Sequence, residues 1–182
     1  MTARTPRKPR PPLDQTRLEE LALAYVGRFA TTRSKLAAYL GRKLRERGWR
    51  EGPGPDLEAL VERHARSGLV DDAAFAMAKA HSLGRRGYGK ARVRQQLYGA
   101  GVGADDAAPA LDHAASEAAD AALRLAKRRR FGPFAAEIAD PKLRDRQLAA
   151  MIRAGHPLKL SLTILRCAPG EVPDADSLFG NL

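Results

Sequence analysis

The chain has 182 residues, 44% of them hydrophobic, which is enough for one ordinary domain or a short row of repeats with a continuous core. Aromatic residues make up only 5%, and the abundance of alanine, leucine, arginine and glutamate favours helices over strands. The formal net charge of +11 indicates a polyanionic partner, either nucleic acid or an acidic protein surface. Because Cys167 is the single cysteine, a disulfide within the chain and a cysteine-based zinc site are excluded.

Residues 1–14 are predicted to form a basic, disordered arm, because their prolines and cations leave little that could be buried. The apolar stretch of a secretory signal is not found in this arm. No segment of the chain approaches the length of a membrane span. We therefore expect a cytoplasmic protein that does not contact a membrane.

Residues 15–69 are predicted to form a first repeat of three helices. Apolar residues between Leu18 and Phe29 recur at the spacing of one helical face. Thr32 can cap a second helix that ends at Gly48, and a third helix follows the GPGP turn at residues 52–55. The outer face of the second helix carries three cations, which are Arg42, Lys43 and Arg45.

The same pattern recurs over residues 70–114 and 115–168, which we interpret as the second and third repeats. A glycine that ends the second helix of each repeat recurs at positions 48, 101 and 155, at intervals of 53 and 54 residues. Such regular spacing is typical of tandem helical units that lean on their neighbours. The predicted fold is all-α, with three helix-turn-helix-like repeats in an elongated, curved arrangement. Residues 160–165 fit a strand or a helix, and the acidic tail at 169–182 is expected to be loose.

The second repeat contains the most one-sided charge in the chain. Between Asp72 and Asp105 there is no carboxylate, whereas six residues are basic: Lys79, Arg85, Arg86, Lys90, Arg92 and Arg94. Apolar residues such as Val93 and Leu97 interrupt this run, which indicates a folded basic surface rather than a disordered tail. The simpler alternative is that the charges only keep the protein soluble.

We expect two parts of this surface to bind a polyanion. Arg85, Arg86 and Tyr88 lie in a glycine turn, where backbone N–H groups at the next helix start add to the attraction of an anion. Lys90 and Arg94 stand one turn apart on that helix. The third repeat places basic residues in the corresponding helix, namely Arg144, Arg146 and Arg153. If these faces align, they form one stripe whose phosphate contacts are independent of sequence and sensitive to salt.

Sites for catalysis or metal binding are not indicated. The stretch at residues 84–90 has the form G-x4-G-K of a phosphate-binding loop, but Ala91 replaces the required serine or threonine and a helical pattern precedes it. Asp71 and Asp72 are adjacent, so on a helix their carboxylates diverge, and helix capping explains them better than a metal or acid–base pair. Asp105 and Asp106 repeat that arrangement. The four histidines are scattered without metal-ligand spacing, so no metal or cofactor is expected.

These features resemble the RecX family of bacterial recombination regulators over residues 18–168. The motifs that carry the resemblance are KLRERGW at residues 43–49, GLVDDAAFA at 68–76, and the Gly87-x-Gly89 turn with the helix that follows it to Gly101. The motif at 68–76, with Asp71, Asp72 and Phe75, is the most specific. Two positions depart from the family pattern, the GPGP turn and the His156-Pro157 pair in place of an aromatic residue.

The resemblance implies a non-enzymatic regulator that binds RecA, or the RecA filament on single-stranded DNA, in the groove of the filament. It implies inhibition of the ATPase and strand-exchange activities of RecA, and we expect a monomer with only weak, non-specific affinity for DNA alone. The side chains expected to make these contacts are Arg42, Lys43, Arg45, Arg85, Arg86, Tyr88, Lys90, Arg94, Arg144 and Arg146. Two alternatives stay open, an autonomous helical DNA-binding protein and a nucleoside triphosphatase.

Overall fold

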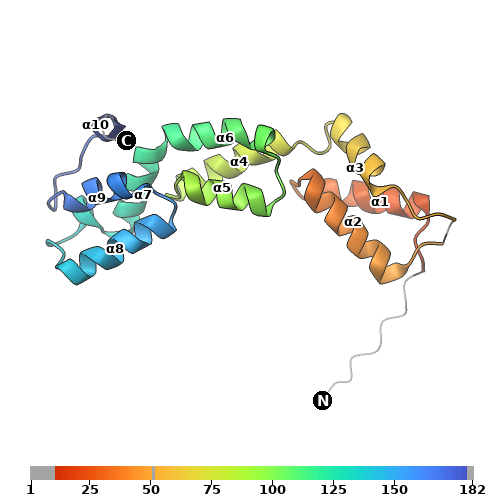
Figure 1. Cartoon of the computed structure of the whole chain (residues 1–182), viewed down its shortest axis with the longest axis horizontal. Coiled ribbons are helices and arrows are strands. Elements are labelled where there is room, and N and C mark those ends of the chain that lie inside the picture. Colours follow the sequence, from red (N-terminus) through yellow and green to blue (C-terminus); the bar gives the residue numbers. More distant parts are fainter. Residues whose placement is uncertain (1–10, 51, 180–182) are drawn as a thin grey trace, which may run out of the picture. The chain divides into compact units, whose positions relative to one another are not determined.

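The computed structural model consists of helices, as Figure 1 shows, and describes residues 11–50 and 52–179. The chain divides into two compact units, Met1–Asp71 and Asp72–Leu182. Within the described residues, β-type pairing is limited to one isolated bridge, between Leu13 and Trp49. The predicted all-α class with three-helix repeats is therefore confirmed.

The first unit contains one three-helix repeat, α1 (Gln15–Val26), α2 (Arg33–Arg47) and α3 (Leu57–Arg66). Each helix begins at a side-chain cap, because a carboxylate or hydroxyl accepts a backbone N–H that has no partner within the helix. The three caps are Asp14, Thr32 and Asp56, which accept from Arg17, Lys35 and Ala59 at 2.9, 3.2 and 2.9 Å. The buried core includes leucines from all three helices, namely Leu18, Leu36, Leu40 and Leu60.

The last residues of the predicted arm belong to this folded unit. Leu13 is fully buried in its core, and its backbone N–H donates to the carbonyl oxygen of Gly48 at 2.9 Å. Its own carbonyl accepts from the N–H of Arg50 at 2.9 Å, so Leu13 pairs with the segment around Trp49. The prediction of disorder to residue 14 is therefore wrong for Leu13 and Asp14, because an apolar side chain and a cap fix them. Pro11 and Pro12 are described as well, and their carbonyl oxygens accept from Arg47 and Arg17. Residues 1–10 of the predicted arm lie outside the described residues.

The second unit opens with α4 (Asp72–Arg85), α5 (Lys90–Gly99) and α6 (Ala104–Ser116). Phe75 packs beside a core that includes the fully buried Val93 and Leu97, as the helical spacing predicts. Asp71 precedes α4, whereas Asp72 is its first residue and only 5% exposed. The second aspartate pair does not occupy the N-cap of α6: Gly103 stands there, and Asp105 and Asp106 lie in the first turn of the helix. A negative charge in this turn still interacts favourably with the positive end of the helix dipole.

A further set of helices completes this unit: α7 (Ala118–Arg129), the short 3-10 helix η1 (Gly132–Phe134), α8 (Pro141–Arg153), α9 (Leu158–Arg166) and α10 (Ala175–Phe179). Residues 160–165 are helical, which settles the two interpretations left open. The tail also differs from the prediction of a loose end, because α10 contacts α7 and Leu178 is 2% exposed in the shared core. Leu178 and the partly buried Ala175 attach this short helix to the core.

The helix-ending glycines of α5 and α8 have the same geometry. Gly101 and Gly155 adopt positive φ angles of 70° and 94°, a conformation that favours glycine. The following N–H reaches back to the helix, from Val102 to the carbonyl of Leu97 at 3.1 Å and from His156 to that of Met151 at 3.2 Å. The predicted joint thus recurs as one local hydrogen-bond pattern at Gly101 and Gly155. Gly48 shares only the positive φ, at 76°, and its carbonyl accepts from Leu13.

In the second unit, the α4–α5 turn and the α8–α9 turn interlock through their backbones. The N–H of Gly89 donates to the carbonyl of Ala154 at 2.9 Å, and the N–H of Ala91 donates to that of Gly155 at 3.3 Å. A Cβ added to Gly89 would collide with the carbonyl oxygen of Gly155. The imidazole of His156, one of the departures from the family pattern, is buried in the same contact. This contact determines which side chains of the second and third repeats can meet.

Candidate functional site

Tyr88 stands at the centre of the basic surface in the second unit. Gly87, with a φ of 73°, ends α4, and the N–H of Tyr88 returns to the carbonyl of Leu83 at 3.0 Å. The half-buried ring packs against the cores on both sides of the interlocked turns. The guanidinium carbons of Arg86 and Arg92 lie 5.4 and 5.9 Å from its centroid, which is within cation–π range.

Three more arginines reach the same place from α7 and α8. Arg128 donates a hydrogen bond to the carbonyl oxygen of Arg86, 42 residues earlier in the chain. Arg128, Arg129 and Arg153 line a hollow of about 340 Å³ together with Tyr88 and Arg92. We call Tyr88 and the five arginines, Arg86, Arg92, Arg128, Arg129 and Arg153, the Tyr88 cluster.

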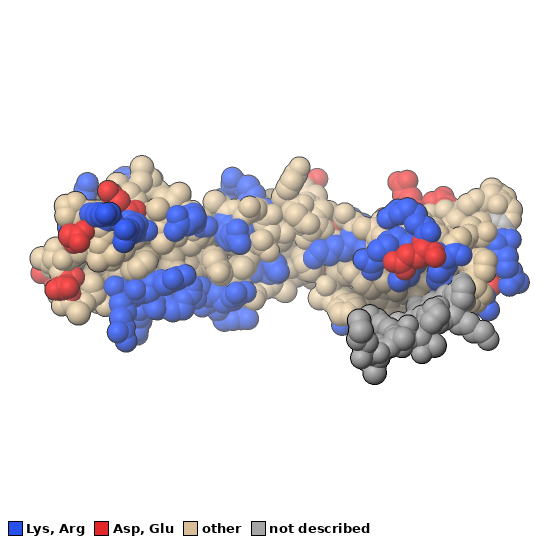
Figure 2. All heavy atoms as spheres, turned by 90° about the horizontal axis from the view of Figure 1, so that it is seen from below, with Lys and Arg blue, Asp and Glu red and all other residues tan. Residues whose placement is uncertain are grey.

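The Tyr88 cluster carries positive charge that the described part of the chain does not neutralise. None of its five arginines forms an ion pair with a carboxylate of residues 11–50 or 52–179. All except the half-buried Arg92 are exposed. In Figure 2, lysine and arginine side chains gather over part of this unit with few carboxylates among them. Guanidinium groups arranged in this way suit the phosphates of a nucleic acid, and an aromatic ring between them suits a base.

The residues predicted from the second repeat are divided among three places. Arg86 and Tyr88 belong to the Tyr88 cluster. Lys90 and Arg94 line a groove of about 600 Å³ between α5 and α6, where the Nζ of Lys90 is 4.0 Å from a carboxylate oxygen of Asp112. Arg85, the last residue of α4, faces a third cavity.

Arg92 was absent from the predicted binding residues although it lies in the same basic run. It is two residues from Lys90 and from Arg94, so it projects about 160° away from each of them around α5. Backbone N–H groups at the start of α5 were expected to add to the attraction of an anion. Two of them, those of Gly89 and Ala91, are instead hydrogen-bonded to the α8–α9 turn and are not available to an anion.

In the third repeat, only part of the predicted helix face points toward the Tyr88 cluster. Arg144 and Arg153 are nine residues apart on α8 and therefore on opposite faces. Arg144 lines a small cavity near Cys167, whereas the exposed Arg146 lies within about 20° of the direction of Arg153. Arg146 can thus extend the cluster and Arg144 cannot.

In the first repeat, the predicted cations are held by local partners. The Nζ of Lys43 is 2.6 Å from a carboxylate oxygen of Glu46, and the Nε of Arg42 is 3.6 Å from the other oxygen. Both side chains also approach the ring of Tyr39, at 5.6 Å for Arg42 and 5.8 Å for Lys43. Arg45 lies exposed on the same helix. Because Glu46 pairs with both Arg42 and Lys43, this face carries less unneutralised positive charge per residue than the Tyr88 cluster.

Arg128 and Arg129, like Arg92, are residues that the sequence analysis did not include in the site. They belong to a basic run at the end of α7, ahead of the break at Phe131, and a run of this kind also fits an ordinary helix end. The available sequence signal was the turn at residues 87–89, because its glycines allow other backbone segments to pack closely. In the structure these segments are α7 beside Gly87 and the α8–α9 turn beside Gly89.

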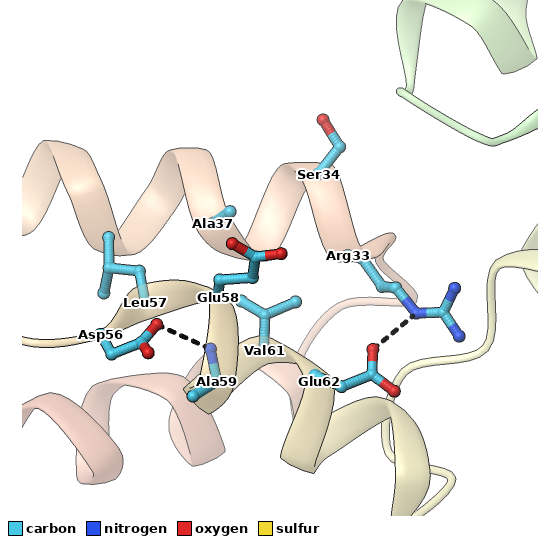
Figure 3. A pocket seen from close by; sticks show the side chains of 9 residues that line it. All are labelled: Arg33, Ser34, Ala37, Asp56, Leu57, Glu58, Ala59, Val61 and Glu62. Carbon is cyan, nitrogen blue, oxygen red and sulfur yellow. Dashed lines mark hydrogen bonds and ion pairs between the residues drawn. The ribbon is translucent and has the colours of Figure 1, made fainter.

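The first unit contains a hollow of a different kind, shown in Figure 3, with a volume of about 860 Å³ between α2 and α3. Its lining includes the apolar side chains of Ala37, Leu57 and Val61. Of its carboxylates, Asp56 caps α3 and a Glu62 oxygen lies 3.9 Å from the Nε of Arg33. These roles are structural, and no cluster of cations is formed there.

The described residues show neither a metal-binding group of side chains nor a membrane-spanning helix. Among residues 11–50 and 52–179, no three histidine, cysteine, aspartate or glutamate side chains are grouped so that they could hold a metal ion. Within the same residues, no helix has both the length and the apolar character needed to cross a membrane. The segment before Lys90 is the helix α4, so the strand that a phosphate-binding loop requires is not there.

Comparison with known proteins agrees with this architecture. Residues 71–111 match the family model described as RecX, second three-helix domain. A regulatory protein RecX from Myxococcus xanthus is 34% identical over 174 residues, which cover 91% of this chain and 92% of that protein. Another from Thermobifida fusca is 28% identical over 151 residues, covering 82% and 77%. A crystal structure of regulatory protein RecX has the same fold, with a TM-score of 0.59 at 23% identity over 82% of this chain and 72% of that one. The chain belongs to the RecX family.

Proposed function

We propose that this protein binds the filament of RecA on single-stranded DNA, lies in its groove and lowers its ATPase and strand-exchange activities. The partner follows from membership of the RecX family, and the Tyr88 cluster is the observation that carries the binding surface. A groove lined by acidic protein and DNA backbone complements a rigid patch of guanidinium groups. We propose that the protein acts without catalysis, as a monomer in the cytoplasm.

The rigidity of the Tyr88 cluster supports a role in binding. Its members come from the α4–α5 turn and from α5, α7 and α8, and the backbone contacts of Gly89 and Ala91 hold these elements together. Side chains positioned in this way lose less conformational entropy on binding than side chains on a mobile tail. Arg146 borders the cluster on α8 and is proposed to contribute from its edge. Lys90 and Arg94 are proposed to contribute separately, from the α5–α6 groove on the other face of α5.

The alternative is an autonomous DNA-binding protein whose helix-turn-helix-like repeats read duplex DNA. That function predicts tight binding to duplex without RecA and a preference among base sequences. The filament function predicts weak binding to DNA alone with no preference. Titration of the protein with labelled single-stranded and duplex oligonucleotides separates the two.

The decisive experiment measures the ATPase rate of RecA on single-stranded DNA while the protein is added, together with co-sedimentation of the two. We expect the native protein to lower the rate and to sediment with the filament. The charge reversals Arg92→Glu and Arg128→Glu should each weaken co-sedimentation at least about tenfold, because each replaces an attraction by a repulsion. Charge reversal at Arg86 and Lys90 that leaves binding and inhibition unchanged would remove the assignment.

A matched control is available on α9 of the same unit. Lys159→Glu makes the same change in charge at an exposed position in the first turn of α9, outside the Tyr88 cluster. It should retain most of the binding. Equal losses in Lys159→Glu and Arg128→Glu would reduce the effect to net charge alone.

A further inference from the structure

Tyr88 also lines a second cavity, which the proposed function does not use. This cavity has a volume of about 310 Å³ and lies between α4, α6 and α7 of the second unit. Its ionisable lining comes from all three helices and their ends: His81 and Arg85 on α4, His113 on α6, Glu117 where α6 ends, and Arg124 on α7. We call it the histidine pocket.

The two imidazoles of the histidine pocket are in contact. The ring centroids of His81 and His113 are 4.2 Å apart, with an angle of 51° between the planes. Each imidazole carries at least one N–H, so the pair can donate hydrogen bonds to an anion in the cavity.

Two guanidinium groups and one carboxylate surround the imidazoles. Arg85 is exposed and makes no ion pair with any residue that the structure describes. Arg124 donates from its Nε to the carbonyl of Gly84 at 3.2 Å and from a terminal nitrogen to Glu117 at 3.3 Å. The carboxylate of Glu117 is therefore engaged, and Arg85 is directed into a cavity without an acidic partner of its own.

We propose that the histidine pocket binds a tetrahedral dianion such as a phosphate monoester. Arg85 supplies a permanent charge and a planar set of donors, and His81 and His113 supply two further N–H donors. The volume is at the lower end of the range for small-molecule sites. This inference requires neither RecA nor a filament, so it stands independently of the proposed function.

The first test uses sulfate, which is a tetrahedral dianion. Sulfate is titrated into the full chain, with chloride at matched ionic strength as the reference, and the histidine ring signals are followed by NMR. We expect sulfate to bind at least about tenfold more tightly than chloride, because a hydrogen bond to a charged group contributes about that factor. The ring signals of His81 and His113 should move, and those of the buried His64 and His156 should not.

Substitutions locate the effect. Arg85→Gln, His81→Ala and His113→Ala should each weaken sulfate binding several-fold by removing a donor, and Glu117→Gln should tighten it several-fold by removing the only carboxylate in the lining. Far-UV circular dichroism checks that each variant is folded. Arg128→Gln, which changes the Tyr88 cluster but not the histidine pocket, should leave the affinity for sulfate intact. Loss of that affinity in Arg128→Gln, or no difference between sulfate and chloride in the native chain, would overturn the proposal.

The source of the phosphate is distinguished with two pairs of probes. A nucleoside 5′-monophosphate is compared with its nucleoside, and a 5′-phosphorylated oligonucleotide with its unphosphorylated counterpart. Movement of the His81 and His113 signals with the monophosphate supports a small-molecule ligand, and movement only with the phosphorylated oligonucleotide supports a strand end. An equal response to both oligonucleotides would show ordinary backbone contact and would contradict the proposal.

Discussion

The Nε2 of His156 lies 3.0 Å from the carbonyl oxygen of Gly87, 69 residues earlier in the chain. Because a carbonyl only accepts, Nε2 must carry the proton, and Nδ1 is left without a partner inside the contact. The imidazole therefore joins the α8–α9 turn to the α4–α5 turn as a neutral donor. A charged ring would be costly there, since burial lowers the pKa of His156 from its ordinary value of 6.5.

This bond predicts a pH dependence of stability. The folded state binds the proton of His156 less readily than the unfolded state, so its contribution is fully present above pH 6.5 and is lost as the pH falls toward the lowered pKa. We expect the free energy of unfolding to fall in that window with a slope of at most about 1.4 kcal/mol per pH unit from this group. Urea denaturation between pH 7.5 and 5 measures it. His156→Gln keeps a donor without a titrating ring and should show a smaller slope.

Gly89→Ala should destabilise the second unit. Its Cβ would meet the carbonyl oxygen of Gly155, which is backbone and cannot turn aside, so a loss of about 1–3 kcal/mol is expected. Gly84→Ala is the control, because a Cβ in that helical position meets nothing within 4 Å. It should stabilise by about 0.5–1 kcal/mol. Urea denaturation followed by circular dichroism compares them, and equal stability of the two variants would contradict the interlocked turns.

Substitution in the Tyr88 cluster should reduce the salt dependence of binding to single-stranded DNA. Each phosphate contact contributes about 0.7 to the slope of log affinity against log salt concentration for a single strand. The double variant Arg128→Gln and Arg153→Gln should therefore lower the slope by about 1.4 without changing base preference. Fluorescence anisotropy of a labelled oligonucleotide over a salt series measures this. Lys159→Gln should keep the native slope, and an unchanged slope in the double variant would exclude the two arginines from the contact.

Leu13→Ala should destabilise the first unit by about 2–5 kcal/mol, since it empties a fully buried leucine site. Trp49, the only tryptophan, packs on the same core, so its fluorescence reports the unfolding of this unit separately. Leu23→Ala, at a leucine that is 53% exposed on α1, should change stability little. Similar midpoints for the two variants would mean that Leu13 belongs to the arm after all.

Local chemistry explains what the sequence analysis predicted correctly. Thr32 and Asp56 are capping residues, and Gly101 and Gly155 take a backbone conformation that favours glycine, so helix starts and ends can be recognised from short segments. The helix α10 could not be recognised in this way, because it is held by packing against α7, which is distant in the sequence. Leu178 is buried in the core that the two helices share.

The candidate site was only half predictable for the same reason. Arg86 and Tyr88 share one turn and were found from sequence, whereas Arg128 joins them through a hydrogen bond across 42 residues. A charge run also cannot separate faces: Lys90 and Arg94 point into the α5–α6 groove, and Arg92 points into the Tyr88 cluster. Tertiary packing, not composition, decides which cations act together.

The interlocked turns limit how far the repeats are separable. A fragment ending after Ser116 would keep the whole of residues 71–111, which the family model recognises, yet it would retain two of the five guanidinium groups around Tyr88. It would also leave the glycine turn without the backbone oxygens of Ala154 and Gly155 that it now meets. The match to the family model therefore needs a shorter stretch of chain than the assembly of the Tyr88 cluster. Exchanging a single repeat with a relative would preserve that match but would separate the arginines of the cluster.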